Sequence, residues 1–142
     1  MATIHKEILI NADAETVWDA ARDFGALHTR LVPGFVADTQ LKPDADPPVR
    51  VVTFASGMVL DEVLVASDDV QRRLVWTIQG EQVRHHNGAL QIFPVEAGVC
   101  RAVWIADVLP PTLAQTFGPA MAAGLQAMKA HLERHAASTA SG

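Results

Sequence analysis

Three polar residues interrupt apolar strand-like segments, and their types suit acid/base chemistry. Glu62 lies within the apolar segment 58–66, Arg50 lies near the start of the segment before it, and His86 lies near the start of a later one. A carboxylate and an imidazole in contact can move a proton near neutral pH, because the imidazole titrates in that range. A carboxylate in an apolar pocket, however, resists ionisation unless a cation or a donor meets it.

These residues support competing hypotheses. Two strand-like segments meet at Ser56-Gly57, which is typical of a hairpin turn, so Arg50 is the natural partner of Glu62. If the two pair, Glu62 stays charged and is largely structural. We favour this interpretation over a polar contact to a ligand and over catalysis, because ion-pair networks perturb titration as active sites do. If Glu62 instead faces His86, the two could act as acid and base.

The other metal-ligating residue types do not predict a metal or cofactor site. His85 has the strand parity opposite to His86 and is expected to face solvent. His131 and His135 are spaced i, i+4 near a helix end, where a surface position is favoured over a metal site. Cys100 is the single cysteine and cannot build a thiolate site. No glycine-rich phosphate loop leads from a strand into a helix.

Composition limits the class of protein and its partners. The chain has 142 residues, of which 49% are hydrophobic, so we expect a single domain over 1–136 followed by a small, polar, disordered tail over 137–142. A net charge of −5 without a basic cluster argues against nucleic acid and against an anionic membrane surface. No apolar run is long enough to span a bilayer. The lone cysteine favours a reducing, cytoplasmic setting.

The elements that must position these residues follow from the periodicity of apolar residues. Alternation predicts a strand over 3–10, and helical spacing predicts a helix over about 14–23 and a short helical piece over 26–31. A meander of six further strands follows, at 35–41, 49–55, 58–66, 73–79, 85–93 and 99–109. Adjacent strands of a meander pair antiparallel, and helices segregated to one face of such a sheet make the fold α+β.

One long helix closes the chain, over 114–137. Its large apolar residues recur at steps of three and four and form a single stripe, made of Phe117, Met121, Leu125, Met128 and Leu132. Pro119 is expected either to begin the continuous part of this helix or to kink it. Such a helix needs a sheet to cover, and if the sheet curves, the space between them can be a pocket.

Short segments spread over almost the whole chain form a recognisable series. They are, in order, 14–18 (AETVW), 23–25 (DFG), 31–34 (LVPG), 50–54 (RVVTF) with Gly57, 61–64 (DEVL), 73–76 (RLVW), 103–104 (VW) and 124–129 (GLQAMK). With these segments the chain resembles the SRPBCC superfamily (START-like, helix-grip fold), and within it the bacterial polyketide cyclase/dehydrase-like branch. Their order and spacing are specific for the fold and not for a reaction. The chain departs from this branch at 83–88 (VRHHNG), where two histidines stand in place of the usual aromatic residue.

The resemblance implies a helix-grip fold: a seven-stranded curved antiparallel sheet wrapped around the long C-terminal helix, with two short helices after the first strand. It also implies which strand parity faces inward, and hence a mostly apolar cavity between sheet and helix. Trp76 and Trp104 would either fill this cavity or form a stacking wall. The residues predicted to contact a ligand are Arg50, Phe54, Leu60, Glu62, Trp76, His86, Leu90, Trp104, Met121, Leu125 and Met128.

The predicted function is therefore the binding of a small, mostly apolar organic or lipid-like ligand without cofactor, at a mouth flanked by 31–35 and 80–85. One alternative is a polyketide cyclase or dehydratase that uses His86 and Glu62 as acid and base. Another is a protein-interaction module that uses the outer face of the sheet. A homodimer through that face is also considered, because its parity carries Val63, Val65, Val75 and Val103.

Overall fold

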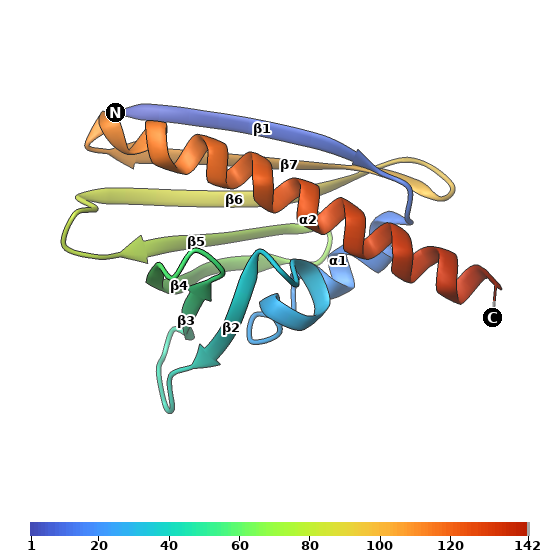
Figure 1. Ribbon diagram of the computed structural model, residues 1–142, viewed down its shortest axis with the longest axis horizontal. Helices are drawn as coiled ribbons and strands as arrows, with labels where there is room; N and C mark the ends of the chain where they lie inside the picture. The colour runs from blue at the N-terminus through green and yellow to red at the C-terminus, as the bar shows by residue number, and fades with distance from the viewer. Residues whose placement is uncertain (142) are drawn as a thin grey trace.

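The computed structural model describes residues 1–141, with side chains through Ser138. Seven strands form one sheet, and a long C-terminal helix lies across it, with two short helical segments after the first strand (Figure 1). The strands are β1 (Ala2–Ile10), β2 (Val36–Leu41), β3 (Val49–Phe54), β4 (Val59–Asp68), β5 (Arg73–Gln79), β6 (His85–Glu96) and β7 (Val99–Leu109). The helical segments are α1 (Ala14–Ala21), the π-helical turn η1 (Leu27–Leu31), the 3₁₀ turn η2 (Pro111–Leu113) and α2 (Ala114–Ser141).

The sheet is antiparallel throughout, in the order β1-β7-β6-β5-β4-β3-β2. Every neighbouring pair is consecutive in the chain except β1 and β7. The register shifts between Val36 and Asp38 in β2, and between Leu64 and Ala66 in β4. Bulges of this kind bend a strand and increase its twist. The bent sheet curves around α2, which confirms the predicted helix-grip fold (Figure 1).

The start of α1 is linked to a distant turn by the side chain of Asp13. Asp13 occupies the N-cap position, but its side chain makes no hydrogen bond to the helix. Its Oδ1 instead accepts a hydrogen bond of 2.7 Å from the backbone N–H of Gly98, in the turn between β6 and β7. The capping residue therefore ties the helix to a distant turn. The helix ends at Ala21, two residues before the predicted Asp23.

The apolar stripe of α2 is buried as predicted, with Phe117, Met121, Leu125, Met128 and Leu132 all at most 8% exposed. Pro119 is exposed and lies inside a continuous helix, so it does not mark the beginning of α2. The helix extends through Ser141, which differs from the disordered tail expected over 137–142; alanine-rich sequence has a high helix propensity. Gly142 lies outside the described residues.

The outer face of the sheet exposes part of the apolar area that its strand parity suggested. Of the four valines of that parity, Val65 is exposed and Val63 is half-buried, whereas Val75 and Val103 are buried. Among these valines, the exposed area therefore comes from β4. The predicted solvent position of His85 is confirmed. Within residues 1–141, no helix is both long and apolar enough to cross a membrane.

Candidate ligand-binding cavity

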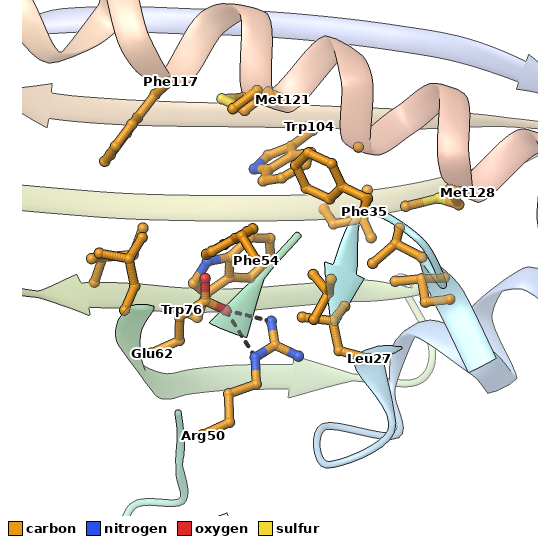
Figure 2. Close-up of a pocket in the computed structure, with 18 of the residues that line it drawn as sticks. Leu27, Phe35, Arg50, Phe54, Glu62, Trp76, Trp104, Phe117, Met121 and Met128 are labelled. Carbon is orange, nitrogen blue, oxygen red and sulfur yellow. Dashed lines mark hydrogen bonds and ion pairs between the residues drawn. The ribbon is translucent and has the colours of Figure 1, made fainter. Parts of the chain in front are cut away.

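A cavity of about 80 Å³ lies between the inner face of the sheet, η1 and α2 (Figure 2). The residues that line it come from η1 and the segment after it (Leu27, Leu31, Val32, Phe35, Val36), from β3, β4 and the turn between them (Arg50, Phe54, Met58, Leu60, Glu62), from β5, β6 and β7 (Leu74, Trp76, Ile78, His86, Leu90, Trp104) and from α2 (Phe117, Ala120, Met121, Gly124, Met128). Apart from the charged pair Arg50 and Glu62 and the imidazole of His86, this wall is apolar or aromatic.

Arg50 and Glu62 form a buried ion pair at the floor of the cavity. They stand opposite each other in the register of β3 and β4, and each is at most 5% exposed. Nε and Nη2 of Arg50 both lie 2.8 Å from Oε1 of Glu62. Nη1 of Arg50 donates to the carbonyl oxygen of Phe24 at 3.3 Å, and the guanidinium carbon lies 4.1 Å from the centre of the Phe24 ring. In the structure Glu62 therefore pairs with Arg50, as the favoured interpretation of the sequence predicted, and not with His86.

Burial and the pairing with Glu62 have opposite effects on the pKa of Arg50. Burial lowers the pKa of its guanidinium, while the charge of Glu62 and the hydrogen bond to it raise that pKa. Arginine remains protonated in proteins because its unperturbed pKa is above 12. Both Arg50 contacts go to Oε1, and the other carboxylate oxygen of Glu62 is directed away from the guanidinium (Figure 2). That oxygen makes no hydrogen bond within the described residues, so it is an acceptor at the cavity wall.

His86 is held as a neutral side chain. It is 4% exposed, and its Nδ1 accepts a hydrogen bond of 3.1 Å from the backbone N–H of Ile78. The ring proton of the neutral imidazole must therefore lie on Nε2. Burial, with a smaller effect from His85, lowers the pKa of His86 to about 4. The ring meets Phe117 edge to face, with 6.0 Å between the ring centres. This arrangement favours a hydrogen-bond donor over a group that exchanges protons at neutral pH.

Trp76 and Trp104 form a tilted pair on the cavity wall, with ring centres 5.7 Å apart and ring planes at 56°. They narrow the cavity but do not close it. The indole Nε1 of each is buried and has no hydrogen-bond partner among residues 1–141. Trp18 of α1 does not line the cavity; it is 3% exposed, and its Nε1 donates to Oδ1 of Asp69 at 2.9 Å.

The family model described as polyketide cyclase/dehydrase and lipid transport matches residues 1–136.

The chain belongs to this family.

The polyketide cyclase/dehydrase branch that the sequence motifs predicted is thereby confirmed. A solved protein from Thermobifida fusca is 30% identical, with a TM-score of 0.77 over 94% of this chain and 95% of that one. A START superfamily protein from Mycobacterium smegmatis is 16% identical, with a TM-score of 0.73 over 93% of this chain and 97% of that one.

A third similar structure is the di-domain ARO/CYC protein BexL of the BE-7585A biosynthetic pathway. It is 14% identical, with a TM-score of 0.78 over 94% of this chain and 47% of that chain. At this identity the likeness is one of fold. No curated protein matches the chain. The polyketide cyclase/dehydrase family thus accounts for the sheet, the helix and the space between them, and the particular side chains must be interpreted from the geometry.

The sequence located most of the cavity wall. Every residue predicted to contact a ligand lines the cavity except Leu125. Four residues advance a helix by about 40° more than one full turn, so Leu125 points to the side of Met121 and packs in the core at 2% exposure. Whether the lining residues contact a ligand stays a prediction.

Sequence reasoning predicted a helical piece over 26–31 and placed Leu31 at the mouth, but it missed that Leu27 of η1 also lines the cavity. A turn of five residues is too short for periodicity to show which of its side chains face inward. It also missed Phe117 as a lining residue, although the helix stripe contained it. Of the two segments predicted to flank the mouth, 31–35 contributes lining residues and 80–85 does not. Within residues 1–141, no group of three or more potential metal ligands is present.

Proposed function

We propose that this protein binds a small, mostly apolar organic or lipid-like molecule between its sheet and α2. The observation that carries the proposal is the cavity itself, whose wall is almost entirely hydrocarbon and aromatic. Ligand sites in proteins are concave and mostly apolar, with a few polar groups that fix orientation. Arg50 and Glu62 supply such a group at one side, and membership in a family described by lipid transport supports the same class of ligand.

The size of the cavity bears on how a ligand enters. Its volume of about 80 Å³ is roughly half that of an engineered apolar cavity that binds benzene. A larger molecule therefore requires the wall to move. Met121 and Met128 are suited to this, since unbranched thioether side chains repack at low cost. The five-residue π-helical turn η1 contributes Leu27 and Leu31 to one wall.

The test compares two substitutions on the same helix. Met121→Trp places a large ring in the cavity, and we expect it to abolish binding of the fluorescent probe 1-anilinonaphthalene-8-sulfonate to the folded protein. Leu125→Met keeps volume at a buried position outside the cavity and should leave probe binding within about twofold. Native mass spectrometry of the freshly purified chain should also show a co-purified small molecule. Unchanged probe binding in Met121→Trp would contradict the proposal.

A cyclase or dehydratase is a second candidate, in which Glu62 and His86 act on a polyketide-like substrate. One observation favours it: Glu62 is buried, yet only one of its two carboxylate oxygens contacts Arg50 (Figure 2). In this function Glu62→Gln would retain ligand binding but lose turnover of a linear poly-β-ketone, measured by absorbance of the cyclised product. A carrier without chemistry shows no turnover in either form of the protein.

Two finer proposals concern the setting of the protein. A homodimer through the outer face of the sheet would use the exposed Val65 and Ile105, and light scattering across a range of concentrations tests it.

A cytoplasmic location is proposed from the single buried thiol of Cys100, and localisation of a tagged chain tests it.

A further inference from the structure

Two hydrogen-bond donors of the cavity wall find no acceptor in the part of the chain that the structure describes. They are the buried Nε1 atoms of Trp76 and Trp104. An indole N–H can only donate, and buried tryptophans normally satisfy it. Trp18 follows that norm, since it donates to Asp69. The fold therefore satisfies the indole that lies outside the cavity and leaves unsatisfied the two that line it.

A third donor stands beside them. Because Nδ1 of His86 accepts the Ile78 N–H, its Nε2 carries the proton. Gly88 brings this atom close to Trp76: a Cβ at Gly88 would lie 3.3 Å from Nε2 of His86 and 3.3 Å from Cε2 of Trp76, the carbon bonded to Nε1. The imidazole and the indole thus share the space that the missing side chain leaves open.

The two indoles present their nitrogens toward the same end of the cavity. A Cβ at Gly124 would lie 3.1 Å from Cζ3 of Trp104, so the benzene edge of this indole faces α2 and Nε1 lies on its other side. In Figure 2 both indole nitrogens lie at the side of their rings toward Phe117. His86 packs against Phe117 as well. This end of the cavity is therefore a region of donors within an apolar wall.

We infer that the ligand carries a hydrogen-bond-accepting oxygen, of the carbonyl type, and that the indole N–H groups of Trp76 and Trp104 bind it. This inference rests on the proposed function. A carbonyl oxygen has two lone pairs and can accept from two donors at once. A pure hydrocarbon would leave both indoles unsatisfied, which is costly for buried donors. The binding site thus selects oxygenated apolar molecules, with the Nε2–H of His86 as an adjacent donor.

The test uses acetophenone and α-methylstyrene, which have the same shape and differ in C=O against C=CH₂. Binding is followed by NMR of the ¹⁵N-labelled protein, in which the three indole N–H signals are assigned from the variants Trp18→Phe, Trp76→Phe and Trp104→Phe. In the wild-type chain, acetophenone should move the Trp76 and Trp104 N–H signals downfield relative to their positions with α-methylstyrene. The Trp18 signal, held by Asp69, should be the same with both.

The affinity ratio of the two probes provides the second measurement. The hydrocarbon is the more hydrophobic probe, so the deciding quantity is the change in this ratio between variants. Trp76→Phe or Trp104→Phe should lower the affinity for acetophenone relative to α-methylstyrene by roughly tenfold, the equivalent of one net hydrogen bond. Trp18→Phe should leave it unchanged.

The outcomes separate this inference from the proposed function. If both probes bind the wild-type chain, with the same ratio in every variant and no differential movement of the Trp76 and Trp104 signals, the inference is overturned and apolar binding stands. If neither probe binds, the proposed function fails and the inference falls with it. The NMR comparison is made on the wild-type chain, and two folded variants are enough to assign its three indole signals, so it remains decisive if one variant does not fold.

Discussion

The backbone N–H of Ile78 donates a hydrogen bond to Nδ1 of His86 at the point where β5 and β6 separate. The paired register of these strands runs from Arg73 opposite Gln91 to Trp76 opposite Gly88 and stops there. Beyond it, the hydroxyl of Thr77 donates to the carbonyl oxygen of His86, and the imidazole takes the place of a strand acceptor for Ile78. His86 therefore supports the sheet on one side and presents Nε2–H to the cavity on the other.

The first prediction concerns pH. Burial lowers the pKa of folded His86 to about 4 from an ordinary value of 6.5, so between these pH values the unfolded chain binds more protons. The free energy of unfolding should therefore be highest above pH 6.5, where His86 is neutral in both states. It should fall by about 3 kcal/mol as the pH decreases toward 4. Urea titrations at half-unit pH steps measure this loss.

His86→Gln removes this titration and should flatten the pH dependence. Burial also lowers the pKa of His131, which contributes with the same sign, so His131→Gln is the matched control and should keep most of the slope. An equal slope in wild type and in His86→Gln would exclude His86 as the group responsible.

The second prediction concerns the buried pair of β3 and β4. Arg50→Met or Glu62→Leu alone leaves the remaining member without its charged partner, and we expect the free energy of unfolding to fall by about 3–5 kcal/mol. The double variant Arg50→Met/Glu62→Leu should recover most of this loss, because well-packed apolar residues replace such pairs at little cost. Chemical denaturation of the four proteins gives the coupling energy, and additive losses would show that the two side chains act independently.

The third prediction concerns the close packing at Gly88. A Cβ there would lie 2.9 Å from Cε1 of His86, so Gly88→Ala must displace the imidazole and weaken its bond to Ile78. We expect a loss of about 1–3 kcal/mol in thermal or urea unfolding. At Gly80 the nearest atom to an added Cβ is Cγ2 of Val83, at 4.0 Å, so Gly80→Ala is the control and should change stability little. Equal effects at the two glycines would refute the packing argument.

The fourth prediction concerns the reactivity of Cys100. Burial, and secondarily the charge of Asp13, raises the pKa of its thiol to about 11. The thiolate is the reactive form, so native protein at pH 8 should react with 5,5′-dithiobis(2-nitrobenzoate) far more slowly than the urea-unfolded chain. Absorbance at 412 nm follows the reaction. Complete labelling of the native protein within the mixing time would show that the thiol is accessible.

The sequence was informative where a local pattern or a neighbouring hairpin decides the structure. The Arg50–Glu62 pair could be predicted because the turn at Ser56-Gly57 fixes which residues of β3 and β4 face each other. The stripe of α2 could be predicted because helical spacing is regular. The inner face of β4 could not be chosen by alternation, since both of its faces are rich in apolar residues, and the family resemblance was needed to assign it.

The remaining features depend on contacts between distant segments. The hydrogen bond from Ile78 N–H to the imidazole of His86 forms because β5 and β6 separate there. No local sequence pattern predicts where the pairing of two strands ends. That the indole N–H groups of Trp76 and Trp104 lack an acceptor can be recognised only once the positions of all the surrounding acceptors are known. Trp18 illustrates the difficulty, since its acceptor, Asp69, lies in a turn at the far end of β4.

The pairing of β1 with β7 has a consequence for biosynthesis. Ile10 of β1 lies opposite Cys100 of β7. In the described sheet β1 pairs with β7 alone, so β1 is synthesised before the other six strands but can pair only after β7 has been made. Until then its isoleucines remain uncovered, in a nascent chain that is otherwise able to form successive hairpins. Translation speed and early chaperone contact at this amino-terminal segment are therefore expected to govern the yield of folded protein.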